Sequence, residues 1–187
     1  MVPVRLHAAV VNLHRNKNGA YGNAWKKRGE VISVLANLAR KVDRLTAGGI
    51  TRDENVLDTA VDLLVYAIKY QTFLADLDPA VAAALFDPAV TAPYSDGTAG
   101  FEALWAVLPA EAVDVGYDTP LDEAVDQVEA AFAGLERQFD AATPRLAVVD
   151  RAASAALLTR AAAALVGAVC RADPDGLAAF IDRWNGP

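Results

Sequence analysis

The sequence predicts an all-α protein, a helical bundle built on a central antiparallel helix hairpin. Apolar residues recur at spacings of three and four along most of the 187 residues, as on the buried face of a helix. The period-two alternation of a half-buried strand is not evident, and the abundant alanines favour helix. A chain of this length is typical of one folded unit.

The first half of the chain supplies the predicted hairpin. Its first arm starts near Lys27 and carries one apolar stripe, formed by Val31, Leu35, Leu38, Val42 and Leu45. Its second arm starts after Thr51 or Asp53 and carries another, formed by Leu57, Val61, Leu64 and Ile68. The two arms meet at the glycines of residues 48–49, a plausible helix end. A short glycine-rich turn between two helices predicts that they pack antiparallel.

A further helix is expected at residues 3–15, followed by an Asn- and Gly-rich loop over residues 16–23. Beyond residue 76 the sequence repeats an Asp-Pro or Thr-Pro pair, and each pair predicts a helix start. The proline-bearing pairs begin at Asp78, Asp87, Thr119, Thr143 and Asp173. We expect the later helices near residues 79–86, 99–108, 120–141, 144–171 and 174–184.

Charge divides the chain into two parts. Residues 1–75 carry 11 basic and 6 acidic side chains, whereas residues 76–187 carry 6 basic and 18 acidic ones. We therefore interpret residues 1–76 as the functional helical core and residues 77–187 as a helical extension packed on it as one unit. The overall net charge of −7 disfavours nucleic acid as a partner, but a basic pocket for a small phosphorylated ligand is compatible with it.

A cytoplasmic location is expected. The single cysteine, Cys170, cannot form an internal disulfide, and no apolar secretory segment follows Met1. The longest apolar run is interrupted by Arg160 and is rich in alanine, which argues against a membrane span.

The second arm of the hairpin carries three carboxylates at intervals of four residues, Glu54, Asp58 and Asp62. This spacing places them along one helix edge, where they repel one another unless something neutralises them. A magnesium ion is one candidate, because it takes carboxylate oxygens and bridges to substrate phosphates. The alternative is stabilisation by the helix dipole and by ion pairs, which explains Glu54 well and Asp62 poorly.

Glu30, Asn37, Lys41 and Arg44 share one edge of the first arm. In an antiparallel hairpin this edge faces the acidic one, so Lys41 or Arg44 is expected to pair with Asp58 or Asp62. Such pairs are either structural or part of a phosphate site, and the sequence leaves both readings open.

The expected loop joins a cation to glycines and aromatic rings, in the order Lys17, Asn18, Gly19, Ala20, Tyr21, Gly22, Asn23, Ala24 and Trp25, with Lys27 close behind. Glycine backbone approaches phosphates closely, and aromatic rings stack on bases. The alternative is a helix connector whose aromatic rings cover the core. His7 and His14, seven residues apart, are interpreted as partly buried helix residues, since this spacing is too long for both to reach one metal ion.

Three of these motifs occur together and in order. They are the segment from Lys17 to Gly22 with Asn23, the Lys41 to Arg44 pair, and the segment from Asp58 to Ile68, which includes Asp62 and Tyr66. This set resembles the nucleotide modification associated domain, first type, over roughly residues 8–72. That family looks distantly similar to the all-α nucleoside triphosphate pyrophosphohydrolases of the MazG type.

The resemblance implies a MazG-like fold and an enzyme that cleaves a nucleoside or deoxynucleoside triphosphate into a monophosphate and pyrophosphate. It also implies a homodimer or tetramer. In this reading magnesium is held by Asp58 and Asp62 with Glu54 or Glu30, while Lys41 and Arg44 act on the phosphates. The expected substrate-binding residues are Lys17, Tyr21, Gly22, Asn23, Trp25, Lys27, Asn37 and Tyr66.

This sequence departs from the MazG pattern, because Lys41 and Arg44 occupy the place of the first acidic pair. An alternative is therefore a non-catalytic nucleotide-binding or partner protein in a phage or bacterial nucleotide-modification pathway. A third reading is a structural protein that self-associates through the alanine-rich segment near residues 152–169.

Overall fold

The computed structural model confirms the all-α class. It describes residues 4–46, 56–108, 113–114, 116, 118–139 and 147–186, and no strand occurs within these ranges. The α-helices are α1 (Val4–Tyr21), α2 (Ala36–Thr46), α3 (Val56–Leu77), α4 (Pro79–Leu85), α5 (Ala99–Val107), α7 (Leu121–Glu136), α8 (Val148–Ala172) and α9 (Pro174–Asn185). Short helical turns are η1 (Gly22–Lys26), η2 (Glu30–Leu35) and η3 (Arg137–Phe139).

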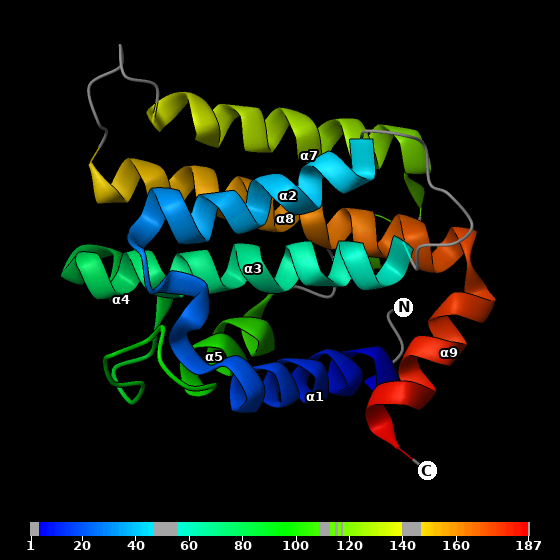
Figure 1. Ribbon diagram of the computed structural model, residues 1–187, viewed down its shortest axis with the longest axis horizontal. Coiled ribbons are helices and arrows are strands. Elements are labelled where there is room, and N and C mark those ends of the chain that lie inside the picture. The colour runs from blue at the N-terminus through cyan, green and yellow to red at the C-terminus, as the bar shows by residue number, and fades with distance from the viewer. Residues whose placement is uncertain are drawn as a thin grey trace.

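Helix α3 lies at the centre of the bundle. In Figure 1, α2 and α7 lie on one side of it, α1 and α5 on the other, and α9 closes one end. Helices α2 and α3 contact each other and run antiparallel, as predicted for the hairpin. The most extensive partner of α3, however, is α8 from the second half of the chain. Residues 77–187 therefore contribute a central helix of the core.

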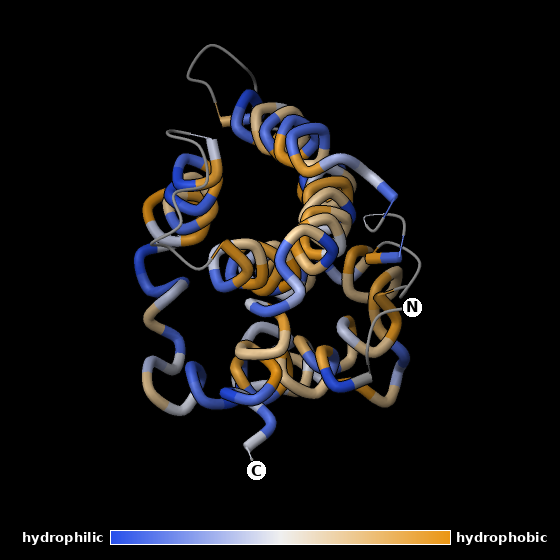
Figure 2. Tube along the Cα trace, turned by 90° about the vertical axis from the view of Figure 1, so that its right-hand side faces the viewer, coloured by the Kyte–Doolittle hydropathy of each residue, from blue (hydrophilic) through white to orange (hydrophobic). Residues whose placement is uncertain are grey.

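Helix α8 is long and apolar because it is a core helix. By length and composition alone, its most apolar 18-residue window could cross a membrane. Of that window, 67% is buried inside the protein, where α8 packs against α3 and α7. Viewed from the end, apolar positions concentrate on the helices in the middle of the molecule (Figure 2). The small side chains from Ala162 to Cys170 are thus used in internal packing.

The predicted loop over residues 16–23 is wrong, because α1 continues through it to Tyr21. The low helix propensity of Asn18 and Gly19 costs only about 1 kcal/mol each, which tertiary packing of the helix outweighs. The chain leaves α1 at Gly22, whose φ of 49° favours glycine. Lys17 and Tyr21 therefore project from a helix.

The first arm of the hairpin is not one regular helix. A 3-10 turn, η1, precedes Gly29, whose φ of 83° and ψ of −178° are accessible essentially to glycine alone. The π-helical turn η2 follows before α2 begins. This turn carries Glu30 into the core, where its carboxylate accepts hydrogen bonds from Tyr70 Oη at 2.6 Å and Arg151 Nε at 3.0 Å.

The remaining helix starts mostly follow the predicted pairs. Asp78 and Asp173 each accept a hydrogen bond from the first turn of their helix, α4 and α9. Asp87 does not start a helix: its carboxylate accepts from the Ala89 amide within a turn. The pair at Thr143 lies outside the described residues.

Candidate functional site

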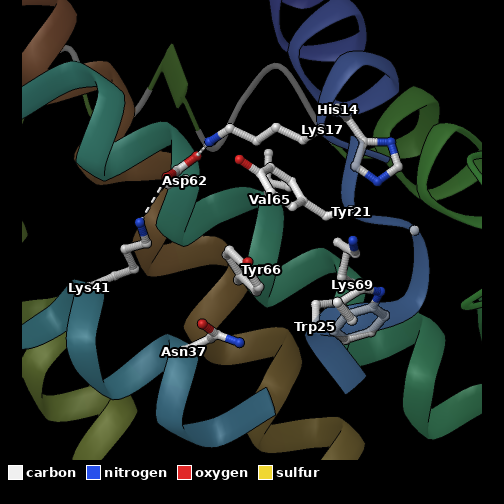
Figure 3. Close-up of a pocket in the computed structure, with 12 residues that line it drawn as sticks. His14, Lys17, Tyr21, Trp25, Asn37, Lys41, Asp62, Val65, Tyr66 and Lys69 are labelled. Carbon is white, nitrogen blue, oxygen red and sulfur yellow. Dashed lines mark hydrogen bonds and ion pairs between the residues drawn. The ribbon is translucent and has the colours of Figure 1, made fainter. Parts of the chain in front are cut away.

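One cavity of about 400 Å³ opens between α1, η1, α2 and α3. We call it the lysine-aromatic cavity, and it is lined by His14, Lys17, Tyr21, Gly22, Ala24, Trp25, Asn37, Lys41, Asp62, Val65, Tyr66 and Lys69. Its volume lies at the lower end of the range of roughly 300–1,000 Å³ usual for small-molecule sites. Figure 3 shows these side chains converging from the surrounding helices.

Helical spacing explains why these residues meet. On α3, Asp62, Tyr66 and Lys69 are separated by four and three residues and therefore share one face. Two other helices do the same: α1 presents His14, Lys17 and Tyr21, and α2 presents Asn37 and Lys41. Because α3 lies between α1 and α2, these faces close around one space.

Asp62 is held between two lysines. Lys41 Nζ donates to Asp62 Oδ2 at 2.8 Å, and Lys17 Nζ donates to Asp62 Oδ1 (Figure 3). Burial alone would raise the pKa of Asp62, but the hydrogen bonds from Lys17 and Lys41 outweigh it and hold that pKa below its usual value. Asp62 is therefore ionised at neutral pH and is shared by two cations.

Lys69 is different, since no ion pair joins it to a carboxylate among the described residues. Its Nζ lies 4.4 Å from the centre of the Trp25 ring and 6.0 Å from that of Tyr66, so aromatic faces partly replace a counter-ion. Burial, together with the charges of Lys26 and Lys17, lowers the pKa of Lys69 to about 8. The cavity thus contains an ammonium group that an anion would stabilise.

Two further polar groups of the cavity have no hydrogen-bond partner among the residues that the structure describes. Both ring nitrogens of His14 and the indole nitrogen of Trp25 are buried and unpaired. His14 is only 2% exposed, and burial, with the charge of Lys69, lowers its pKa to about 4, so the imidazole is neutral. Unpaired indoles also occur at Trp105 and Trp184, but neither of these lines the cavity. A buried unpaired polar group costs about 1–3 kcal/mol, which a ligand in the cavity would offset.

Eight predicted site residues line the cavity. They are Lys17, Tyr21, Gly22, Trp25, Asn37, Lys41, Asp62 and Tyr66. His14 and Lys69 complete it and were missed by the sequence analysis. Their signal was helical spacing, since Lys69 lies seven residues after Asp62 and His14 lies three before Lys17.

Other predicted residues lie elsewhere. Asp58 pairs with Arg183 of α9 at 2.9 Å, and the exposed Arg44 does not line the cavity. Asn23 donates to Asp96 at 2.9 Å, and Lys27 is exposed. Of the two predicted basic partners, only Lys41 reaches the cavity.

The described residues do not fit the predicted magnesium site. Both oxygens of Asp62 accept from lysines, the Asp58 carboxylate accepts from Arg183, and Glu30 is buried against Arg151. No group of three His, Cys, Asp or Glu side chains suited to a metal ion occurs in the described part of the chain. Glu54, the remaining predicted ligand, lies outside it. Hard cations need several oxygen ligands, and the cavity offers one carboxylate beside three ammonium groups.

Fold and cavity together define an all-α protein with a cationic, aromatic-lined pocket. No model of a known protein family matches the chain, and no solved structure matches it. The chain is similar to the "Gene 30 protein" of Bacillus phage SP01, with 28% identity over an alignment that covers 43% of this chain and 47% of the phage protein. The match thus spans about half the length of that relative.

Proposed function

We propose that this protein binds a nucleotide in the lysine-aromatic cavity without requiring a divalent metal. The observation that carries this proposal is the charge arrangement: Lys17 and Lys41 share the single carboxylate of Asp62, and Lys69 adds a third ammonium group. An anionic ligand would balance this excess. Phosphate is a suitable anion because it accepts charge-assisted hydrogen bonds from several lysines at once.

The aromatic rings support the base-binding half of the proposal. Tyr21 is 72% exposed although it lines the cavity, and Tyr66 is partly buried on the facing helix α3. Stacking a planar base on such a ring contributes about 1–3 kcal/mol of binding free energy, largely whichever base it is. The Trp25 ring is less available, since it is buried beneath Lys69.

The motif resemblance supports the same reading. Tyr21, Gly22, Lys41, Asp62 and Tyr66 belong to the motifs that resemble the nucleotide modification associated domain, and all of them line the cavity. The presence of these motif residues in one cationic cavity favours a nucleotide over other phosphorylated ligands.

Isothermal titration with a panel of nucleotides tests the proposal. Titrations in EDTA and in magnesium are compared at pH 7, and similar affinity in both is expected. Val107→Ala, a change of an exposed side chain away from the cavity, serves as the control variant. A panel without any binding, or binding that vanishes in EDTA, would contradict metal-independent recognition.

Cleavage of a nucleoside triphosphate, with magnesium as cofactor, stays a separate prediction. Asp62 is the observation in its favour, since an ionised carboxylate lies in the cavity beside Lys41. Release of pyrophosphate from a panel of triphosphates in magnesium tests it directly. A folded sample without turnover on any of them leaves the binding proposal standing alone. The predicted homodimer or tetramer is tested by light scattering.

A further inference from the structure

The unpaired groups of the cavity gather at one end. Figure 3 shows His14, Lys69 and Trp25 on one side of Tyr66, and the Lys41-Asp62-Lys17 ion pairs on the other. The first end contains a cation without a carboxylate partner, an indole N–H and a neutral imidazole, all within the described residues. These are donors for an oxyanion, and no acidic side chain among the described lining residues lies at that end of the cavity.

The charge count limits the size of the anion. Among the described residues that line the cavity, three ammonium groups against one carboxylate leave an excess of two positive charges, because His14 is neutral. A phosphomonoester carries a charge of about −1.5 to −2 at pH 7, which matches this excess. Each further phosphate adds negative charge that the lining side chains do not balance.

The position of Asp62 also disfavours a ligand with more than one phosphate. A polyphosphate that starts at Lys69 and extends along the cavity approaches the Asp62 carboxylate at the other end (Figure 3). Asp62 already accepts from Lys17 and Lys41, so those lysines are only partly available to additional phosphates. Like charges at short range without a metal ion between them repel.

We infer that the ligand is a nucleoside monophosphate, whose phosphate lies against Lys69, His14 and the Trp25 N–H while its base lies against Tyr66 and Tyr21. This inference rests on the proposed function and makes it more specific. The Lys41-Asp62-Lys17 group then faces the nucleoside part of the ligand.

Comparing a nucleoside with its monophosphate and triphosphate tests the inference. Titrations at pH 7 in EDTA, repeated for each common base, are expected to show the monophosphate binding at least tenfold tighter than both the nucleoside and the triphosphate of the best base. If the triphosphate binds as tightly as the monophosphate or more tightly, the inference fails while nucleotide binding stands. If no compound binds, both fail.

Two matched pairs of variants test the placement of the phosphate. Lys69→Met keeps the apolar stem of the side chain, and Arg28→Met removes an exposed charge outside the cavity as its control. His14→Phe keeps the ring stacked on Phe101, and His7→Phe changes a histidine that stacks on Trp105 outside the cavity.

The monophosphate preference over the nucleoside is expected to fall at least tenfold in Lys69→Met and severalfold in His14→Phe. Nucleoside affinity itself stays unchanged in both, and the two controls behave as the unmodified protein. Circular dichroism confirms that each variant is folded. A preference that survives Lys69→Met, or that falls equally in Arg28→Met, overturns the placement.

Discussion

Lys41 Nζ lies 2.8 Å from Asp62 Oδ2, and the opposite oxygen of the same carboxylate accepts from Lys17. Two helices are thereby tied to α3 through one acidic side chain. Their ammonium groups also line a cavity in which Asp62 is the only acidic side chain among the described residues. The ion pairs of Asp62 therefore affect both the stability of the bundle and the net charge of the cavity.

Asp62→Asn separates these two roles. The amide keeps the size of the side chain but leaves Lys17 and Lys41 without an anionic partner, so the cavity gains positive charge. We expect nucleotide affinity to rise severalfold and the free energy of unfolding to fall, because the nearly buried Lys41 loses its partner. Titration calorimetry and urea unfolding measure the two effects. A loss of affinity would instead mean that Asp62 contacts the ligand or its metal ion.

Binding and stability should depend on pH in opposite directions near Lys69. Its pKa is about 8 in the folded protein and near 10.5 when unperturbed. An anion favours the protonated form, so affinity falls as the pH rises above about 8, by up to about tenfold per pH unit.

The folding stability of the free protein changes with pH in the opposite direction to ligand affinity. Between pH 8 and 10.5 the unfolded chain binds more protons at this site than the folded chain, so the destabilisation caused by burying the charged Lys69 is relieved as the pH rises. Lys69→Arg is the control, since arginine stays charged and should remove both trends. The groups around Lys69 that also carry or acquire charge are Lys17, Lys26, His14, Asp62 and Tyr66. If the affinity of Lys69→Arg still falls above pH 8, the pH dependence comes from one of these neighbouring groups and not from Lys69.

Tyr21→Ala is expected to weaken nucleotide binding without changing the fold. The ring is 72% exposed, so its removal takes little apolar surface from the core. Loss of a base-stacking ring costs about 1–3 kcal/mol of binding free energy. The thermal unfolding midpoint should stay within experimental error. Unchanged affinity would leave Tyr66 as the base-stacking ring.

Two glycines near the site should respond oppositely to alanine. Gly19 lies inside α1 with open space around it, so Gly19→Ala should stabilise the protein by roughly 0.5–1 kcal/mol. Gly29 has open space too, but its backbone conformation excludes a β-carbon, and Gly29→Ala should cost about 1–3 kcal/mol. Urea denaturation of both variants measures the difference. Equal effects would show that the backbone at Gly29 relaxes freely.

The parts predicted well from the sequence are those that depend on local periodicity. Helical spacing in an antiparallel hairpin predicted that Lys41 or Arg44 meets Asp58 or Asp62, and the 2.8 Å ion pair between Lys41 and Asp62 confirms one of these pairings. The helix starts at Asp78 and Asp173 were predicted because capping is a property of neighbouring residues.

The errors in the site arise where geometry departs from a regular α-helix or a partner is distant in sequence. The prediction for Glu30 assumed α-helical phase, whereas the π-helical turn rotates it toward Arg151, 121 residues away. Asp58 meets Arg183 across 125 residues of sequence, which no local pattern indicates. Treating residues 16–23 as a loop hid the shared face of His14, Lys17 and Tyr21 on α1.

The burial of α3 against α8 determines which fragments of this chain can fold on their own. Leu57, Leu64 and Ile68 are fully buried on a helix whose largest neighbour is contributed by residues 148–172. A fragment that stops near Ala75 would retain every side chain of the lysine-aromatic cavity yet present this apolar surface to water, and it should aggregate when expressed alone. Ligand-binding assays therefore have to use a polypeptide that retains residues 148–172.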